Sequence, residues 1–478
     1  MVKKIAIFSI LLPATLLFSY IPAEASSSFV DIVAESALLA EADTGQILFE
    51  HNTRHRHPPG SLAKTMTLLI AVNAIESGEV KEGDLVTMTD TAWFDIAAKS
   101  SPLNIRPGEE MTLLDLMYSA YVGSANEACN MIAEHIAGSV ESFVEMMNSR
   151  AVALGCDNTN FTNPHGQHHE NQYTTARDQF LIFRDAVSKP LFAEISGVFR
   201  HTIQSTNMSD TRRLTGTNSL LNPNGKYYFR HCTAGKASVM FEGGHSFEGI
   251  AESDGLSIIA IVLGSDEILL EDDSYDMRNL TEARRLFEWG FSQFGWRIVI
   301  SPSEPIAKTP ILHGAGADFV NLRAESEIKL LLNNDIPLDA FIRTITIYSD
   351  DADEPLVAPI EAGDVLGEIS VTRGGVEYGP VLLVANTSIQ LHRFEFIRIQ
   401  AKEMLSSPLV RKVIWGLVII FVGYIALVVR YNIVRRKRMR RIALAKRRLA
   451  EERQQALEEE RRERERYNGG HTRPPRRG

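Results

Sequence analysis

One apolar segment close to the C-terminus constrains this chain most. Residues 413–429 carry no charged side chain, and the apolar run continues past Arg430 to Val434. Together they approach the roughly 20 residues that an α-helix needs to cross a bilayer, and the long side chain of Arg430 can reach the headgroups. The basic stretch RRKRMRR follows at once. Because basic residues gather on the cytoplasmic side of a span, we predict one transmembrane helix over 413–434 and a cytoplasmic tail over 435–478.

The N-terminus carries a shorter apolar run. Lys3 and Lys4 precede an apolar stretch over 5–20, and Ala23-Glu24-Ala25 follows it. A basic start, a short apolar core and a small-x-small site are typical of a secretory signal peptide. An uncleaved anchor fits less well, because Pro13 interrupts the run. We therefore predict a signal peptide over 1–25, and we expect the chain between it and the transmembrane helix to be extracellular.

The segment over 30–293 alternates between strand and helix patterns. Residues 37–50 read ALLAEADTGQILFE, two short apolar runs around a turn, which is typical of a β-hairpin. The runs HSFEGIAES and LSIIAIVLG are joined by Asp254-Gly255 and predict an antiparallel strand pair. Helices are predicted over Thr112–Tyr121, Glu127–Ile136, Ser142–Leu154, Thr174–Val187 and Thr281–Phe291. The segment is therefore predicted to be an α+β domain, with a helical cluster and an antiparallel sheet.

The remaining segments differ in composition. From Arg297 the chain is rich in valine, isoleucine and turn residues, and TITIYS, GEISVTR and VLLVAN read as short strands. These predict a small all-β domain over 297–399. Arginine and glutamate alternate over 435–466, which predicts a charged helix in solvent. The net charge is −10 although this tail is rich in arginine, so the rest of the chain is acidic and nucleic acid is not an expected partner.

A serine and a lysine stand at a predicted helix start. Pro58, Pro59 and Gly60 end an extended segment, and a run of apolar helix formers follows. Ser61 falls in the first turn, and Lys64 lies one turn later on the same face. A lysine whose pKa is lowered by burial or by nearby positive charge can take the proton of a serine hydroxyl. The positive end of the helix can also stabilise an oxyanion.

Two further positions complete a possible acyl-transfer site. Ser124-Ala125-Asn126 lies about sixty residues later in a predicted loop between helices, and Lys236 precedes the strand pair. Ser124 could relay a proton to the leaving group, and Asn126 could hydrogen-bond the substrate amide. Lys236 could attract a carboxylate and keep Lys64 neutral by repulsion.

This order of Ser-x-x-Lys, Ser-x-Asn and a lysine-led third box resembles the serine D-alanyl-D-alanine carboxypeptidases, the low-molecular-weight penicillin-binding proteins. The similarity covers about 30–399 and includes EADTGQILFEHN, PPGSLAKTMTLLIAV, NTNFTNPHGQHHENQYTTARD and APIEAGDVLGEISV. It implies a serine DD-peptidase/β-lactamase-like fold for the first domain. It also implies that Ser61 is the nucleophile, Lys64 its base and Ser124 the relay. Asn126 and Lys236 would contact substrate, and the backbone N–H groups of Ser61 and Val239 would form the oxyanion hole.

The third box departs from the family pattern of Lys-Thr-Gly. Aligned without gaps between Tyr227-Tyr228 and Asp254-Gly255, it reads Lys236-Ala237-Ser238. The threonine hydroxyl that would bind the substrate carboxylate is missing at Ala237. Losing a hydrogen bond to a charged group costs about 1.5–3 kcal/mol. Ser238 could supply a hydroxyl from the next position, but a strand alternates faces, so this requires a local twist.

The resemblance implies an enzyme that trims the terminal D-Ala from peptidoglycan stem peptides and that β-lactams inhibit. The altered third box leaves open a catalytically weakened or silent peptidoglycan-binding scaffold. A β-lactamase fits less well, because no dedicated deacylating base is visible.

No metal and no cofactor are expected. Two groups of histidines could bind a metal, but their spacing does not match a helical zinc pair: His51, His55 and His57, and His165, His168 and His169. The cysteines form no zinc or disulfide pattern and are expected to be buried: Cys129, Cys156 and Cys232.

Overall fold

The computed structural model describes residues 30–93, 95–97, 103–240, 243–269, 275–351 and 355–468. The predicted signal peptide and the last ten residues of the predicted tail lie outside these ranges. The chain divides into two compact units. One holds residues up to Glu304 together with 324–346 and 367–383, and the other holds 305–323, 347–366 and the chain from Val384 onward. The boundary expected near residue 297 stays a prediction.

The first unit is built on a five-stranded antiparallel sheet of order β2-β1-β9-β8-β7. Its strands are β1 (Ser36–Glu41), β2 (Ile47–His51), β7 (Cys232–Met240), β8 (Gly244–Ser253) and β9 (Leu256–Ser265). The predicted hairpin and the predicted strand pair are both present. Within the described residues β7 has a strand partner on one side only, and an extended ligand could add to its other edge as a further strand.

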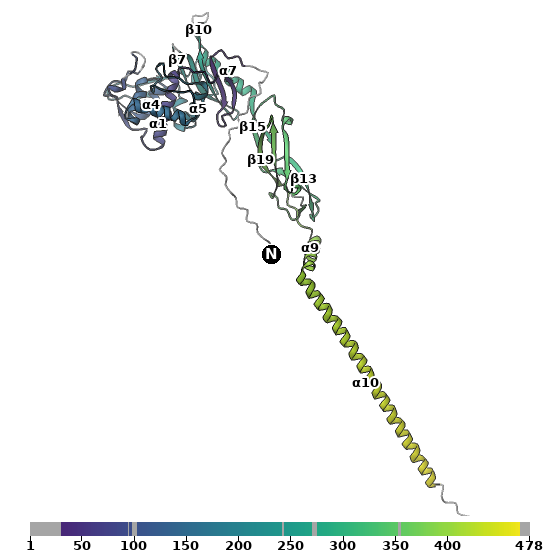
Figure 1. Ribbon diagram of the computed structural model, residues 1–478. Helices are drawn as coiled ribbons and strands as arrows, with labels where there is room; N and C mark the ends of the chain where they lie inside the picture. The colour runs from purple at the N-terminus through teal and green to yellow at the C-terminus, as the bar shows by residue number, and fades with distance from the viewer. Residues whose placement is uncertain are drawn as a thin grey trace, which may run out of the picture. The chain divides into compact units, whose positions relative to one another are not determined.

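Both faces of this sheet are covered by helices. Helices α1 (Ala63–Glu76) and α5 (Ala176–Val187) lie on one face, and α7 (Arg278–Gln293) lies on the other (Figure 1). Alternate side chains of β9 accordingly enter two separate apolar cores, Ile259 and Ile261 on one side and Ile258 and Ala260 on the other. Burial on both faces explains why this strand reads as a continuous apolar run.

The predicted helices are present with small shifts at their ends. They are α2 (Leu113–Tyr121), α3 (Asn126–Ala137), α4 (Val140–Ala153), α5 and α7. Thr112 caps α2, since its hydroxyl accepts a hydrogen bond from the Asp115 backbone N–H. Short elements that the sequence analysis did not predict connect them: η2 (Thr91–Trp93), β4 (Glu110–Thr112), α6 (Pro190–Ser196), β5 (Arg200–Ile203), β6 (Arg212–Thr215), η3 (Ser219–Leu221), β10 (Glu267–Leu269) and β11 (Tyr275–Met277). A further short strand, β3 (Leu85–Thr87), pairs with β4.

The later residues are rich in strands. β12 (Phe294–Ile300) pairs with β15 (Ile328–Asn333), and a further sheet has the order β16-β18-β19-β14-β13-β17. Its strands are β13 (Pro305–Leu312), β14 (Phe319–Ala324), β16 (Ile342–Ile347), β17 (Leu356–Val357), β18 (Val365–Arg373) and β19 (Val376–Ala385). Short helices η4 (Leu338–Ala340) and α8 (Tyr348–Asp351) lie between them. The strand predicted from TITIYS therefore ends at Ile347.

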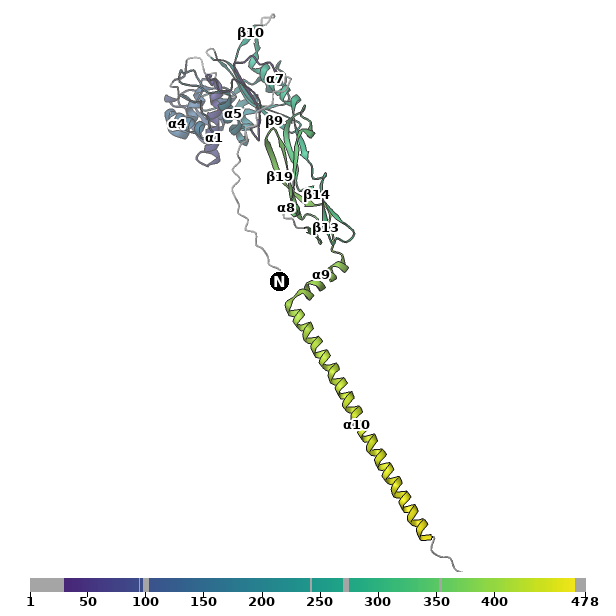
Figure 2. The same cartoon turned by 45° about the vertical axis from the view of Figure 1, so that its right-hand side comes forward.

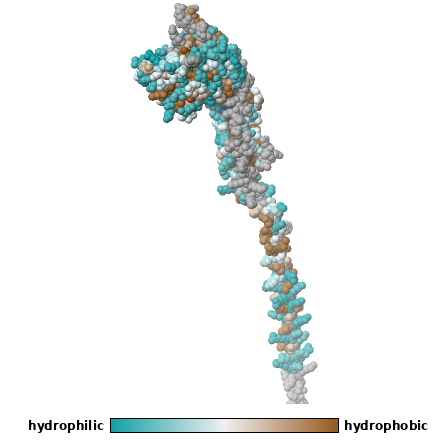
Figure 3. Space-filling view, turned by 60° about the vertical axis from the view of Figure 1, so that its left-hand side comes forward, coloured by the Kyte–Doolittle hydropathy of each residue, from teal (hydrophilic) through white to brown (hydrophobic). Residues whose placement is uncertain are grey.

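Two helices follow the strands. α9 (Arg393–Ser406) begins within the segment that was predicted to be all-β, and α10 (Pro408–Asn468) includes both the predicted transmembrane segment and most of the tail. Figure 2 shows that the two helices run in different directions, with the break at the extended Ser407 before Pro408, because a residue before proline disfavours helical dihedrals. Among the described residues, α10 alone is long and apolar enough to cross a membrane. Figure 3 shows its apolar band followed by a hydrophilic stretch.

Candidate active site

Ser61 lies at the start of the buried helix of the first unit. It belongs to the 3₁₀ turn η1 (Gly60–Leu62), which continues directly into α1. Gly60 has a φ of +53°, a conformation that glycine adopts at little cost. A Cβ there would also collide with the side chains of Ser238 and Met240. The predicted helix start is thus present, and glycine lets the turn carrying Ser61 approach strand β7.

Lys64 lies one turn further along and is fully buried. Its Nζ donates hydrogen bonds to Oδ1 of Asn126, at 2.8 Å, and to the backbone oxygen of His165, at 2.5 Å. Burial lowers the pKa of Lys64, while Cys129 and Glu127 raise it by smaller amounts. Of the two causes considered from the sequence, burial and nearby positive charge, burial is therefore the main reason that this amine can be neutral. Asn126, expected to contact substrate, holds the amine in place.

Ser124 completes the polar group around Ser61. Its Oγ lies 3.4 Å from Oγ of Ser61. The residue has a φ of +58° in the short connection between α2 and α3. A non-glycine residue with this φ is strained, and here the unusual backbone directs the hydroxyl at Ser61. The structure thus brings Ser124 next to Ser61, although the two residues lie far apart in the sequence.

Lys236 on β7 is also buried. Its Nζ donates to the backbone oxygen of Tyr121 at 2.5 Å and lies 4.9 Å from the centre of the Tyr121 ring. Burial, with a contribution from the charge of Lys64, lowers its pKa to about 7. Burial is thus the main cause of the lowered pKa at both lysines.

The Ser238 side chain contacts Ser61, whereas it was expected to supply a hydroxyl to the substrate carboxylate. Its Oγ accepts a hydrogen bond of 2.9 Å from the backbone N–H of Ser61. The strand needs no twist for this, since Ser238 pairs with Ser246 in regular register. The donors of an oxyanion hole lie about 2.7–3.1 Å from the oxyanion. The Ser238 oxygen, at 2.9 Å from the Ser61 nitrogen, therefore occupies the position that the oxyanion of the tetrahedral intermediate would take. The hydroxyl therefore occupies one donor of the predicted oxyanion hole instead of extending toward a substrate carboxylate.

The other predicted donor, the N–H of Val239, lies on the open edge of β7. The N–H and C=O of Ala237 bond to the Thr217 hydroxyl, at 3.3 and 2.7 Å, and so point away from β8. Because alternate residues of a strand share an edge, the backbone of Val239 faces the same open side. Thr217 was not identified from the sequence, since it lies twenty residues before Ala237 and carries no motif. It places a hydroxyl beside the position where the family threonine is missing.

A buried carboxyl group behind the site was also missed. Glu248 on β8 lies opposite Lys236, accepts from the Thr65 hydroxyl, and accepts from Nε2 of Gln179 at 2.6 Å. Burial raises its pKa to about 8, against smaller opposite effects of these hydrogen bonds. The carboxyl group is therefore protonated at pH 7. A single acidic residue within the apolar run of β8 was the only sequence signal for it.

This protonated carboxyl predicts a pH-dependent stability. The unfolded pKa is about 4.5, so between pH 4.5 and 8 the folded state holds a proton that the unfolded state releases, and stability falls as pH rises. We expect Glu248→Gln to remove this loss, so that the unfolding temperature of the wild type falls relative to the variant from pH 5 to pH 7. Thermal unfolding of both full-length proteins, followed by fluorescence, measures the difference. A constant difference across this range would contradict a raised pKa.

Comparison with known proteins identifies the family. Residues 22–267 match the model of the D-alanyl-D-alanine carboxypeptidase family. The chain is 26% identical over 342 residues to the D-alanyl-D-alanine carboxypeptidase DacF of Bacillus subtilis, covering 72% of this chain and 82% of that protein. It is 28% identical over 359 residues to the D-alanyl-D-alanine carboxypeptidase DacA of Escherichia coli, covering 74% and 83%.

Solved structures agree on the fold. The chain resembles penicillin-binding protein 6B from Escherichia coli with a TM-score of 0.57 at 25% identity, covering 76% of this chain and 98% of that one. Penicillin-binding protein 5 from Haemophilus influenzae gives a TM-score of 0.56 at 24% identity, covering 76% and 100%. The fold of helices around an antiparallel sheet is therefore that of these peptidases. The family model matches more than half of the 478 residues of this chain. The chain therefore belongs to the D-alanyl-D-alanine carboxypeptidases, serine hydrolases of the low-molecular-weight penicillin-binding group.

Proposed function

We propose that this chain is an exported, membrane-anchored carboxypeptidase that removes the terminal D-Ala from peptidoglycan stem peptides through an acyl-enzyme on Ser61. The observation that carries the proposal is that the Ser124 hydroxyl lies 3.4 Å from the Ser61 hydroxyl, with buried Lys64 one turn further along the helix and β7 beside Ser61. An extended peptide can pair with β7 as a further strand, which would place its terminal peptide bond beside Ser61.

In this mechanism Ser61 Oγ attacks the carbonyl carbon of the penultimate D-Ala. Neutral Lys64 accepts the hydroxyl proton, and the charge on the carbonyl oxygen is stabilised by the backbone N–H groups of Ser61 and Val239. The C–N bond then breaks. Ser124 delivers a proton to the departing amine of the terminal D-Ala and is reprotonated from Lys64. A water molecule hydrolyses the ester by the reverse path, with Lys64 as its base, and regenerates Ser61.

The substrate carboxylate would be attracted by Lys236 in its protonated form. Ala237 supplies no hydroxyl there. The Thr217 hydroxyl lies nearby but donates its proton to the backbone oxygen of Ala237, so it would have to break that bond to replace the missing threonine. β-Lactams would acylate Ser61 in the same way as the peptide. Two of the structural relatives are named as penicillin-binding proteins, which supports this part of the proposal.

The arrangement in the membrane follows from the sequence pattern. We place the catalytic domain and the strand-rich segment over 297–399 outside the cell, α10 across the membrane at 413–434, and the charged tail in the cytoplasm. The exposed apolar band of α10 supports the span.

A second candidate function is favoured by one observation. The Ser238 hydroxyl occupies the Ser61 N–H, and the third box lacks its threonine, so the site is at least weakened. In the extreme case the chain would bind stem peptides without cleaving them.

Release of D-alanine separates the two functions. Full-length protein in detergent is expected to release D-alanine from a peptide ending in D-Ala-D-Ala, and Ser61→Ala is expected to abolish the release. Binding of the peptide by the wild type without release would favour the scaffold over the enzyme.

A further inference from the structure

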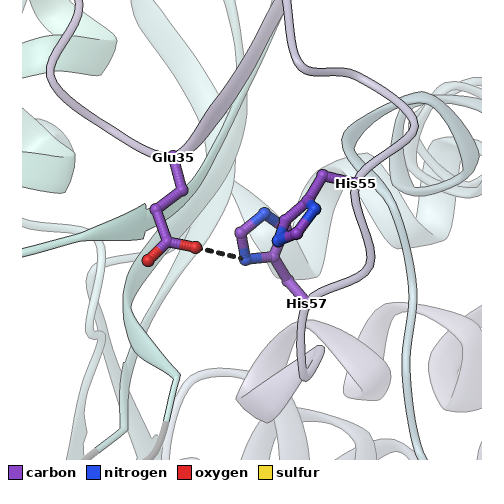
Figure 4. A group of neighbouring side chains, drawn as sticks. All are labelled: Glu35, His55 and His57. Carbon is purple, nitrogen blue, oxygen red and sulfur yellow. Dashed lines mark ion pairs between the residues drawn. The ribbon is translucent and has the colours of Figure 1, made fainter.

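Three side chains that could bind a metal converge close to Ser61 but outside its polar group. Glu35 immediately precedes β1, and His55 and His57 belong to the segment that leads from β2 to η1 (Figure 4). One potential ligand atom from each lies within 4.8 Å of the other two. Nδ1 of His57 is 3.5 Å from Oε2 of Glu35. The proposed acyl-transfer reaction uses none of these residues.

The hydrogen bonds around His57 fix which ring nitrogen carries its proton. The Ser36 hydroxyl donates to the backbone oxygen of Asn52 at 2.9 Å, so its oxygen is left to accept. Nε2 of His57 lies 2.9 Å from that oxygen and therefore carries the proton. In the neutral ring Nδ1 then has a free lone pair, and this lone pair faces the Glu35 carboxylate.

Two electron-rich atoms facing each other at this distance repel unless a cation lies between them. A proton on Nδ1 could act as this cation, and so could a metal ion, which the nearby ring of His55 could also bind. A neutral imidazole held through its other nitrogen is the form in which histidine binds metals.

We propose that Glu35, His55 and His57 form a binding site for a divalent transition-metal ion, with Zn²⁺ as the best match. Two imidazoles and one carboxylate are a known zinc ligand set, and zinc bonds of about 2.0–2.1 Å place tetrahedral ligands roughly 3.3 Å apart. The separation of 3.5 Å between Glu35 and His57 is close to this value. The fourth position would hold water.

The surroundings suit such a site. His57 is fixed, because it is buried and exchanges two backbone hydrogen bonds of 2.8 Å with Thr174. Glu35, whose side chain is 65% exposed, and His55, also exposed, can move the remaining distance and leave the ion an access path. Gly264 makes room, since a Cβ there would lie 3.0 Å from Glu35 and 3.1 Å from His57. The bound ion would tie the start of β1 to the segment that leads into Ser61.

Zinc binding by the untagged full-length protein tests this inference. After treatment with EDTA and its removal, we expect calorimetric titration with Zn²⁺ to show one site, and we expect added Zn²⁺ to raise the unfolding temperature because it binds only the folded state. Glu35→Gln and His55→Ala are expected to weaken binding at least about tenfold and to remove the zinc-dependent rise. Both side chains are exposed, so the metal-free unfolding temperature should not change.

His51→Ala is the matched control, because it removes a neighbouring exposed histidine that is not part of the group. It should bind Zn²⁺ as the wild type does. Unchanged affinity in Glu35→Gln and His55→Ala, or no binding by the wild type, would overturn the proposal. If the wild type binds no Zn²⁺, the contact between Glu35 and His57 would be an ion pair with a protonated His57.

Discussion

Replacing Lys64 with arginine is expected to slow acylation of Ser61 by about 10²- to 10⁴-fold, the range that a general base contributes. The lysine amine can lose its proton, because complete burial lowers its pKa. An arginine side chain stays protonated at every accessible pH and cannot accept the proton of the Ser61 hydroxyl. The rate of penicillin acylation gives the effect directly. It is measured by quenching the reaction at intervals and recording the mass spectrum of the intact protein.

A second substitution tests whether slow acylation in Lys64→Arg comes from a disturbed structure instead of the lost base. Lys64→Met removes the amine and keeps an unbranched side chain of similar length, so it should be as slow as Lys64→Arg. Circular dichroism of both variants checks that the helices are intact. If either folded variant acylated within a fewfold of the wild type, Lys64 would not be the base.

Replacing Ser238 with glycine or alanine is expected to accelerate acylation by about two- to tenfold. In the wild type the Ser238 hydroxyl accepts from the Ser61 N–H at 2.9 Å and must move before an oxyanion can use that donor. Breaking a neutral hydrogen bond costs about 0.5–1.5 kcal/mol, which is about two- to tenfold in rate. Variants without the hydroxyl do not meet this cost. Single-turnover rates with a β-lactam measure the gain.

Both variants lack the hydroxyl, and they differ from each other in one methyl group and in backbone freedom, so agreement between them would assign the gain to the lost hydroxyl. Ala237→Thr added to Ser238→Gly should accelerate the reaction further, because it restores a donor for the substrate carboxylate. If Ser238→Gly and Ser238→Ala were no faster than the wild type, the hydroxyl would not obstruct the site, and the weakened character inferred from the third box would have to rest on Ala237 alone.

Local patterns made much of the fold predictable. Pro58, Pro59 and Gly60 mark the start of the helix that carries Ser61, Thr112 caps α2, and Asp254-Gly255 joins β8 to β9. Each of these signals acts within a few residues, which is why the sequence alone reveals it. The resemblance to the family then added what local patterns lack, the association of Ser61 with Ser124 and Lys236.

The remaining features depend on contacts between distant segments. Nothing in the sequence shows that the Ser238 side chain points at Ser61. The alternation of side chains along a strand predicts which face of the sheet a residue lies on, but not which residue of another segment it contacts there. Glu248 opposite Lys236 depends on the register of two strands. The proposed metal site needs Glu35, twenty residues before His55, so the histidine spacing alone could not predict it.

Intact-mass analysis of the full-length protein after incubation with penicillin tests the central claim, that Ser61 forms an acyl-enzyme. The account predicts a covalent adduct of one penicillin per chain in the wild type, formed slowly because of Ser238, and no adduct in Ser61→Ala. An adduct that persisted in Ser61→Ala would place the nucleophile elsewhere. No adduct in the wild type at high penicillin concentration and long incubation would contradict an active site and favour the silent scaffold.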